Sequence, residues 1–165
     1  MTREELIVAA EITFEKLMTP TRGLHPERMN EPMAEGKPSF KDLVAQLIFW
    51  NGLTLRALEE LNYDRVFDWT PYAIEDSWNT LARERLRPQN IKRVLTELRL
   101  AHSTLTEALR RIPEQKLLLN GELPRWLVEN LPGRYERSIP QVEEWAGRLR
   151  REGRALPPLN ILGGT

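Results

Sequence analysis

The positions of proline and glycine constrain this chain most, because they divide it into stretches whose apolar residues recur every three or four positions. This spacing places apolar side chains on one face of an α-helix, whereas a half-buried strand would alternate them every second residue. Four of these stretches are long enough to form helices that pack against one another. The sequence therefore predicts an all-α fold built on four helices, without internal repeats.

The first two helices have capping residues at their expected starts. Thr2 and Ser39 are each followed, three positions later, by an acidic residue, a spacing at which the hydroxyl can accept a hydrogen bond from a backbone N–H. We expect the first helix to end near Met18 and the second to run from about 39 to 61. Gly52 lies inside the second helix, at a cost of about 1 kcal/mol relative to Ala. We expect a neighbouring element to pack closely there.

The third and fourth helices are bounded by prolines. Pro88 suits a first helical turn, so we expect the third helix to start there and to stop at Pro113. The fourth helix carries apolar residues from Tyr135 to Leu149 at helical spacing. Because Pro140 lies inside this pattern, the helix either restarts or bends at that residue.

The remaining segments differ in composition. Residues 20–38 contain many prolines and glycines and are expected to form a loop, and one short helix is expected before residue 132. Residues 62–87 are rich in aromatic side chains, which bury large apolar areas, so this long connection is expected to pack on the helices. We expect a single domain over residues 1–152 and a flexible C-terminal tail over residues 153–165.

Charge and composition exclude several classes of function. The 24 Lys and Arg residues balance 24 Asp and Glu residues, so no net field attracts nucleic acid or an anionic membrane. The chain has no Cys, which excludes disulfides and thiolate chemistry. Its start does not resemble a signal peptide, and no apolar run approaches the length of about 18 residues that a membrane helix needs. We expect a cytoplasmic protein that binds neither nucleic acid nor a membrane.

Few residues suit metal binding or catalysis. The chain has two histidines, His25 and His102, which excludes a site made of three. It has no glycine-rich phosphate loop and no nucleophile elbow. His102 lies on the apolar stripe of the third helix, where it is either a catalytic residue or an imidazole at the edge of the core that is satisfied by a hydrogen bond.

Three segments, in order along the chain, are similar to known sequence signatures. Residues 36–50, GKPSFKDLVAQLIFW, are similar to the signature G-x-W-S-x-K-D-x-L-A-H-L-x-x-W, with Pro38 in place of the first tryptophan. Asn79 and Pro88 resemble an N…P-x-x-x-V-L segment, and residues 134–145, RYERSIPQVEEW, resemble H-Y-x-x-H-I-P-Q-I-x-x-W. In these three segments the chain resembles the DinB-like superfamily and within it the ClbS/DfsB family. The resemblance implies a DinB-like four-helix bundle, commonly a homodimer.

The resemblance also implies where a functional site would lie. Metal-binding members carry one histidine on the second helix and a pair of histidines four residues apart on the fourth, so that both imidazoles lie on one face. In this sequence those positions are Gln46, Arg134 and Ser138. A guanidinium repels a cation and an amide is a weak ligand for transition metals, so we expect no metal and no other cofactor. A pocket that persists here is expected to be lined by Gln46, Trp50, Asn79, His102, Arg134, Tyr135 and Ser138.

The function implied by the ClbS/DfsB resemblance is a metal-free small-molecule-binding protein or a hydrolase. One alternative is a non-catalytic dimeric bundle, and another, motivated by the superfamily fold, is a metal-dependent thiol transferase. The ligand, and whether the protein is an enzyme, stay open at this point.

Overall fold

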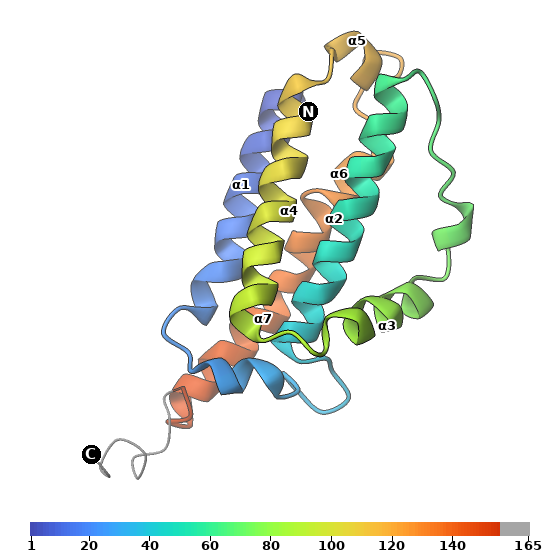
Figure 1. Ribbon diagram of the computed structural model, residues 1–165. Helices are drawn as coiled ribbons and strands as arrows, with labels where there is room; N and C mark the ends of the chain where they lie inside the picture. Colours follow the sequence, from blue (N-terminus) through green and yellow to red (C-terminus); the bar gives the residue numbers. More distant parts are fainter. Residues whose placement is uncertain (156–165) are drawn as a thin grey trace.

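The computed structural model describes residues 1–155, and its regular elements are helices, which confirms the predicted all-α class. Four long helices lie side by side around one core (Figure 1), with α1 packed on α4 and α7, and α2 packed on α4 and α7. These long helices are α1 (Arg3–Met18), α2 (Phe40–Asn62), α4 (Ile91–Arg111) and α7 (Gly133–Arg151). The shorter elements are α3 (Glu75–Leu86), α5 (Glu114–Leu117), α6 (Arg125–Asn130) and the 3₁₀ turns η1 (Thr19–Thr21), η2 (Pro26–Asn30) and η3 (Thr70–Tyr72).

The capping residues act as the sequence predicts. The Thr2 hydroxyl accepts a hydrogen bond from the Glu5 backbone N–H at 3.1 Å, and the Ser39 hydroxyl accepts one from the Asp42 N–H at 3.0 Å. Both residues satisfy backbone donors that the first helical turn leaves unpaired. The starts of α1 and α2 are therefore encoded locally.

The long helices bury one continuous apolar core. The side chains of Leu6, Phe40 and Leu98 are fully buried, and Phe40 stacks on Trp145 with ring centroids 5.7 Å apart. These contacts join α1, α2, α4 and α7. Burial of this apolar surface is the main favourable contribution to the folded state.

Two local expectations are wrong. The helix α4 begins at Ile91 rather than at Pro88, because the Asn90 side chain caps it by accepting from the Arg93 N–H at 2.9 Å. Gly52 is exposed, and nothing lies within 4 Å of the position that a Cβ would occupy. No neighbouring element packs against it within the described residues.

Pro140 lies inside α7, which is continuous from Gly133 to Arg151. Of the two alternatives for this position, the helix therefore does not restart. Pro140 is exposed, so water can reach the backbone carbonyl that the proline leaves without an intrahelical donor.

The aromatic connection folds against the bundle, as its composition predicts, and contains the helix α3, which the sequence analysis did not identify. Trp78 of α3 stacks on Phe49 of α2 with ring centroids 5.7 Å apart. Trp69, just before η3, approaches Trp126 of α6 with centroids 5.6 Å apart. Figure 1 shows this connection arching over one side of α2. It forms one wall of the site described below.

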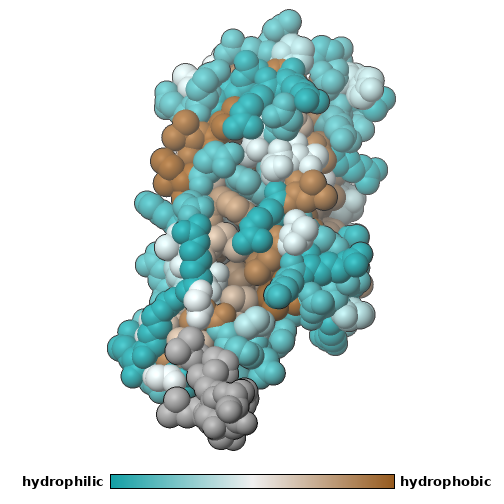
Figure 2. Space-filling view, turned by 60° about the vertical axis from the view of Figure 1, so that its left-hand side comes forward, coloured by the Kyte–Doolittle hydropathy of each residue, from teal (hydrophilic) through white to brown (hydrophobic). Residues whose placement is uncertain are grey.

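Among residues 1–155, no helix combines the length and the apolar character needed to cross a bilayer. Figure 2, which brings the α1 side of the molecule forward, shows apolar residues along a face that is otherwise hydrophilic. Val8 and Ile12, one turn apart on α1, are 55% and 49% exposed. The expected homodimer stays a prediction.

Most of the expected C-terminal tail, residues 156–165, lies outside the described residues.

Candidate ligand-binding site

Five of the seven residues expected in a pocket line one small cavity between α2, α3 and α7. Its volume is about 80 Å³. The periodicity of α7 explains part of this arrangement, because residues four positions apart lie on the same helical face. The five are Gln46 and Trp50 from α2, Asn79 from α3, and Arg134 and Ser138 from α7.

Trp50 anchors the cavity to α3. Its side chain is buried, and its indole N–H donates a hydrogen bond to Asn79 Oδ1 at 2.7 Å. Asn79 therefore satisfies the one polar atom of a large apolar side chain, which would be costly to leave unpaired. This bond ties the inserted helix α3 to the centre of α2.

Arg134 is a charged residue of the cavity whose side chain is fixed by contacts with three neighbouring side chains. Its guanidinium carbon lies 3.9 Å from the centroid of the Trp50 ring, a cation–π contact. Its Nε donates to Asn130 Oδ1 at 2.6 Å, and its Nη2 donates to Glu75 Oε1 at 2.7 Å. Burial lowers the pKa of the guanidinium, and the hydrogen bond to Glu75 opposes this shift. These contacts orient the guanidinium before any ligand arrives.

The other polar residues of the cavity differ in whether their side chains have hydrogen-bond partners. The Ser138 hydroxyl donates to the backbone carbonyl of Arg134 at 2.9 Å, within one turn of α7. The amide of Gln46 has no hydrogen-bond partner among residues 1–155, so both its donor and its acceptor are available to a ligand. The cavity therefore offers an amide beside a fixed positive charge.

A larger groove adjoins this cavity and shares Trp50, Arg134 and Arg137 with it. Its volume is about 810 Å³, within the range of about 300–1,000 Å³ typical of small-molecule sites. Its walls come from α2, from the connection before α3, from the start of α3, from α6 and from α7. The residues that line it are Trp50, Trp69, Thr70, Tyr72, Ala73, Glu75, Arg125, Trp126, Glu129, Asn130, Arg134 and Arg137.

Most of this groove could not be predicted from the sequence. The aromatic density of residues 62–87 was the available signal, but it did not show which rings face the cavity and which face the bundle. Trp126 and Arg137 come from other segments, and they reach the groove because α6 packs against the start of α7. Nothing in the local pattern predicted that contact.

The other two expected pocket residues, His102 and Tyr135, lie elsewhere, in a buried polar chain that joins the four long helices. Asn51 Nδ2 donates to the Tyr135 hydroxyl at 2.9 Å. The same hydroxyl lies 2.9 Å from His102 Nδ1, and His102 Nε2 lies 3.2 Å from Glu11 Oε2. Phe14 stacks on the imidazole with centroids 4.1 Å apart. Neither His102 nor Tyr135 lines the cavity or the groove.

The hydrogen-bond chain assigns the protons of its members. A carboxylate can only accept, so His102 Nε2 carries the proton that points at Glu11. In the neutral imidazole Nδ1 is then the acceptor, and the Tyr135 hydroxyl donates to it while accepting from Asn51. Every member has a complementary partner only while His102 is neutral, because a second imidazole proton would face the proton of the Tyr135 hydroxyl.

This arrangement predicts that stability falls in acid through His102. Burial is the main cause that lowers the pKa of His102, with Arg110 acting in the same direction, while the hydrogen bond and the charge of Glu11 oppose it. The unfolded chain therefore binds this proton more readily than the folded protein does. The contribution of neutral His102 to the free energy of unfolding is complete above the unfolded pKa of about 6.5, and it is lost as pH falls through the lower pKa of the folded state.

Urea denaturation at pH 7.5 and pH 5.5 measures this effect. We expect wild type to lose more stability between these values than His102→Gln does, whereas His25→Gln should keep the wild-type difference. Equal losses in wild type and His102→Gln would show that His102 is not responsible.

The residues at the three expected metal positions do not fit a cation. Arg134 places a positive charge beside Gln46, and the hydroxyl of Ser138 is used by the α7 backbone. Within residues 1–155 no three His, Asp or Glu side chains are grouped so as to hold a metal ion.

Comparison with known proteins supports the fold alone. No protein-family model matches the chain, and no curated protein matches its sequence. The chain is similar in structure to a protein in a crystal structure described as an uncharacterised protein from Escherichia coli UTI89, with a TM-score of 0.75. The two are 18% identical, and the alignment covers 90% of this chain and 95% of the other. The helical arrangement described here therefore also occurs in a protein whose structure has been solved.

Proposed function

We propose that this protein is a DinB-like protein of the ClbS/DfsB type that binds a small organic molecule without a metal. The observation that carries the proposal is the juxtaposition of the cavity at Gln46, Arg134 and Ser138 with the large aromatic groove through Trp50, Arg134 and Arg137. Metal-binding relatives would hold a cation at these three positions. In this chain the same positions place polar groups in the small cavity, which adjoins a groove large enough for a small molecule.

Binding fits the groove better than hydrolysis does. A hydrolase without a metal needs a group that can activate water or attack the substrate. The carboxylates of the groove are both in ion pairs, Glu75 with Arg134 at 2.7 Å and Glu129 with Arg125 at 2.8 Å. Neither histidine lines the groove. The residues of the groove are therefore better suited to recognition than to hydrolysis.

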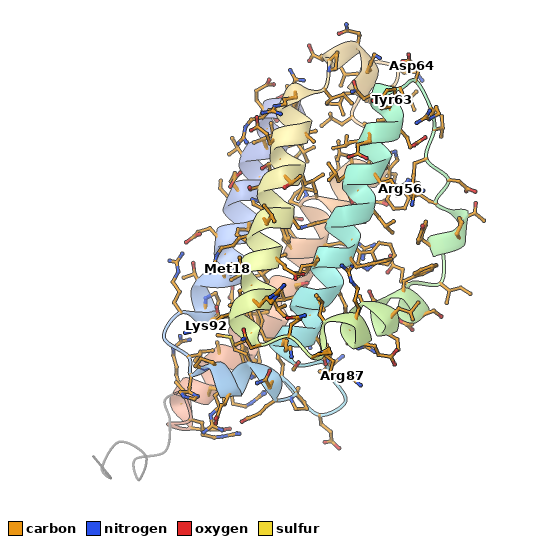
Figure 3. All side chains as sticks on the ribbon, viewed as in Figure 1. Met18, Arg56, Tyr63, Asp64, Arg87 and Lys92 are labelled. Atoms are coloured by element: carbon orange, nitrogen blue, oxygen red, sulfur yellow. The ribbon has the colours of Figure 1, made fainter. Side chains whose placement is uncertain are left out.

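A thermal-shift screen of small organic compounds tests this proposal. A ligand present at 100 times its dissociation constant stabilises the folded state by about 2.7 kcal/mol, which corresponds to a rise in Tm of roughly 5–10 °C for a chain of this size. We expect hits whose shift disappears in Arg134→Ala and Gln46→Ala. Arg87→Gln is the control, because Arg87 lies at the junction of α3 and α4 and does not line the groove (Figure 3).

Three results would contradict the proposal. Hits that shift both site variants as much as wild type would bind elsewhere. Stoichiometric nickel, zinc or iron in the purified protein would instead favour a metal-dependent thiol transferase. A protein that binds nothing in the screen but sediments as a dimer would fit the alternative of a non-catalytic dimeric bundle.

A further inference from the structure

We infer that the ligand of this site is a planar aromatic carboxylate, with its ring among the tryptophans of the groove and its carboxylate on Arg137. This inference rests on the proposed function and specifies the chemistry of the ligand. Two independent features of the groove support it: the shape of its aromatic lining and the balance of its charges.

Aromatic rings from three separate segments line the groove. Trp50 comes from α2, Trp69 and Tyr72 from the connection, and Trp126 from α6. Trp69 and Trp126 lie with centroids 5.6 Å apart and planes inclined by 43°. Aromatic faces and edges interact best with another flat ring in a stacked or tilted arrangement. The groove therefore favours a flat unsaturated ring over a saturated ring of similar size.

The charges of the groove leave one positive group without a carboxylate. Arg134 pairs with Glu75 and Arg125 pairs with Glu129. Arg137 has no carboxylate within ion-pair distance among residues 1–155, and its guanidinium makes only a long contact of 3.5 Å to the backbone carbonyl of Glu129. The groove therefore has an excess of one positive charge, which favours an anionic ligand over a neutral or cationic one.

The position of Arg137 places the anion at one end of the ligand. Arg137 lines both the groove and the small cavity, as Arg134 does. A carboxylate at this junction can accept the two-pronged hydrogen bonds that a guanidinium donates, and the free amide of Gln46 adjoins the same point. The ring then extends from the junction into the groove towards Trp69 and Trp126.

Three matched probes test the inference by isothermal titration calorimetry with the full chain. They are 2-naphthoate, its uncharged analogue 2-naphthamide, and the saturated decahydronaphthalene-2-carboxylate. A hydrogen bond between two charged groups is stronger than one to a neutral amide, so we expect the naphthoate to bind roughly 10- to 100-fold more tightly than the amide. Loss of ring stacking should weaken the saturated acid by about fivefold or more.

Variants assign the effect to Arg137. Arg137→Gln should weaken naphthoate binding by about tenfold and change naphthamide binding by less than twofold. Because Arg137 is exposed and has no ion-pair partner in the described residues, this variant should fold like wild type. Arg87→Gln, the same change at the junction of α3 and α4, should leave both affinities unchanged.

The results separate this inference from the proposed function. Equal binding of naphthoate and naphthamide, or an equal loss of both in Arg137→Gln, would overturn the inference. Absence of naphthoate binding would also overturn it. If uncharged compounds nevertheless gave hits that depend on Arg134 in the thermal-shift screen, the proposed function would stand. A screen without such hits would remove the proposed function as well.

Discussion

Replacing Tyr135 by Phe should lower the free energy of unfolding by about 2–6 kcal/mol, since one hydroxyl satisfies two buried groups and each unsatisfied group costs about 1–3 kcal/mol. Tyr135 is fully buried, accepts from Asn51 and lies 2.9 Å from His102 Nδ1. The ring of Phe fills nearly the same space, so the loss comes from the hydroxyl rather than from a cavity. Urea denaturation followed by circular dichroism measures it.

The same substitution at Tyr63 provides the control. Tyr63 caps the C-terminal end of α2, where Figure 3 labels it, and is 67% exposed. Tyr63→Phe should change stability by no more than about 0.5 kcal/mol, as surface substitutions usually do. If the two substitutions had equal effects, the buried chain from Asn51 to Glu11 would not contribute to stability.

Leu98→Ala should destabilise the protein by about 2–5 kcal/mol, because it removes a buried side chain from the centre of α4 and leaves a cavity. Leu98 is fully buried and belongs to the core that joins the long helices. Leu100, two positions further along the same helix, is 64% exposed. We expect Leu100→Ala to cost no more than about 0.5 kcal/mol.

This pair of substitutions tests which face of α4 packs against the other long helices. Both residues are leucines on α4, and they differ in that one side chain faces the core and the other faces solvent. Chemical denaturation of both variants at one pH gives the comparison. A larger loss from Leu100→Ala than from Leu98→Ala would contradict the packing described here.

The secondary structure was predictable wherever a local signal acts alone. The caps at Thr2 and Ser39 depend on a hydroxyl and a backbone N–H three residues apart, and both are present. The start of α4 was missed because two local signals compete. Pro88 suits a helical start, but the Asn90 side chain caps the helix two residues later. Likewise, α3 lies within residues 62–87, where the aromatic density predicts a connection packed on the bundle but does not show that part of it is helical.

The candidate site was predictable only in part. Arg134 and Ser138 share one face of α7 because of helical periodicity, and the family resemblance placed Gln46 opposite them. His102 and Tyr135 were expected in the same pocket, and they form a separate buried chain instead. Tyr135 follows Arg134 directly but points about 100° away from it around the helix, and its hydroxyl contacts Asn51 and His102 between the long helices.

The spacing of apolar residues, the caps and the prolines determined that this chain forms long amphipathic helices, because those signals act over a few residues of the backbone. The aromatic groove depends on contacts between Trp50, Trp69 and Trp126, which lie on separate segments. That Arg137 has no carboxylate partner among residues 1–155 likewise depends on which arginines reach Glu75 and Glu129. Only the packing of α3 and α6 against the bundle decided these features, since side-chain partners distant in sequence are selected by the tertiary structure.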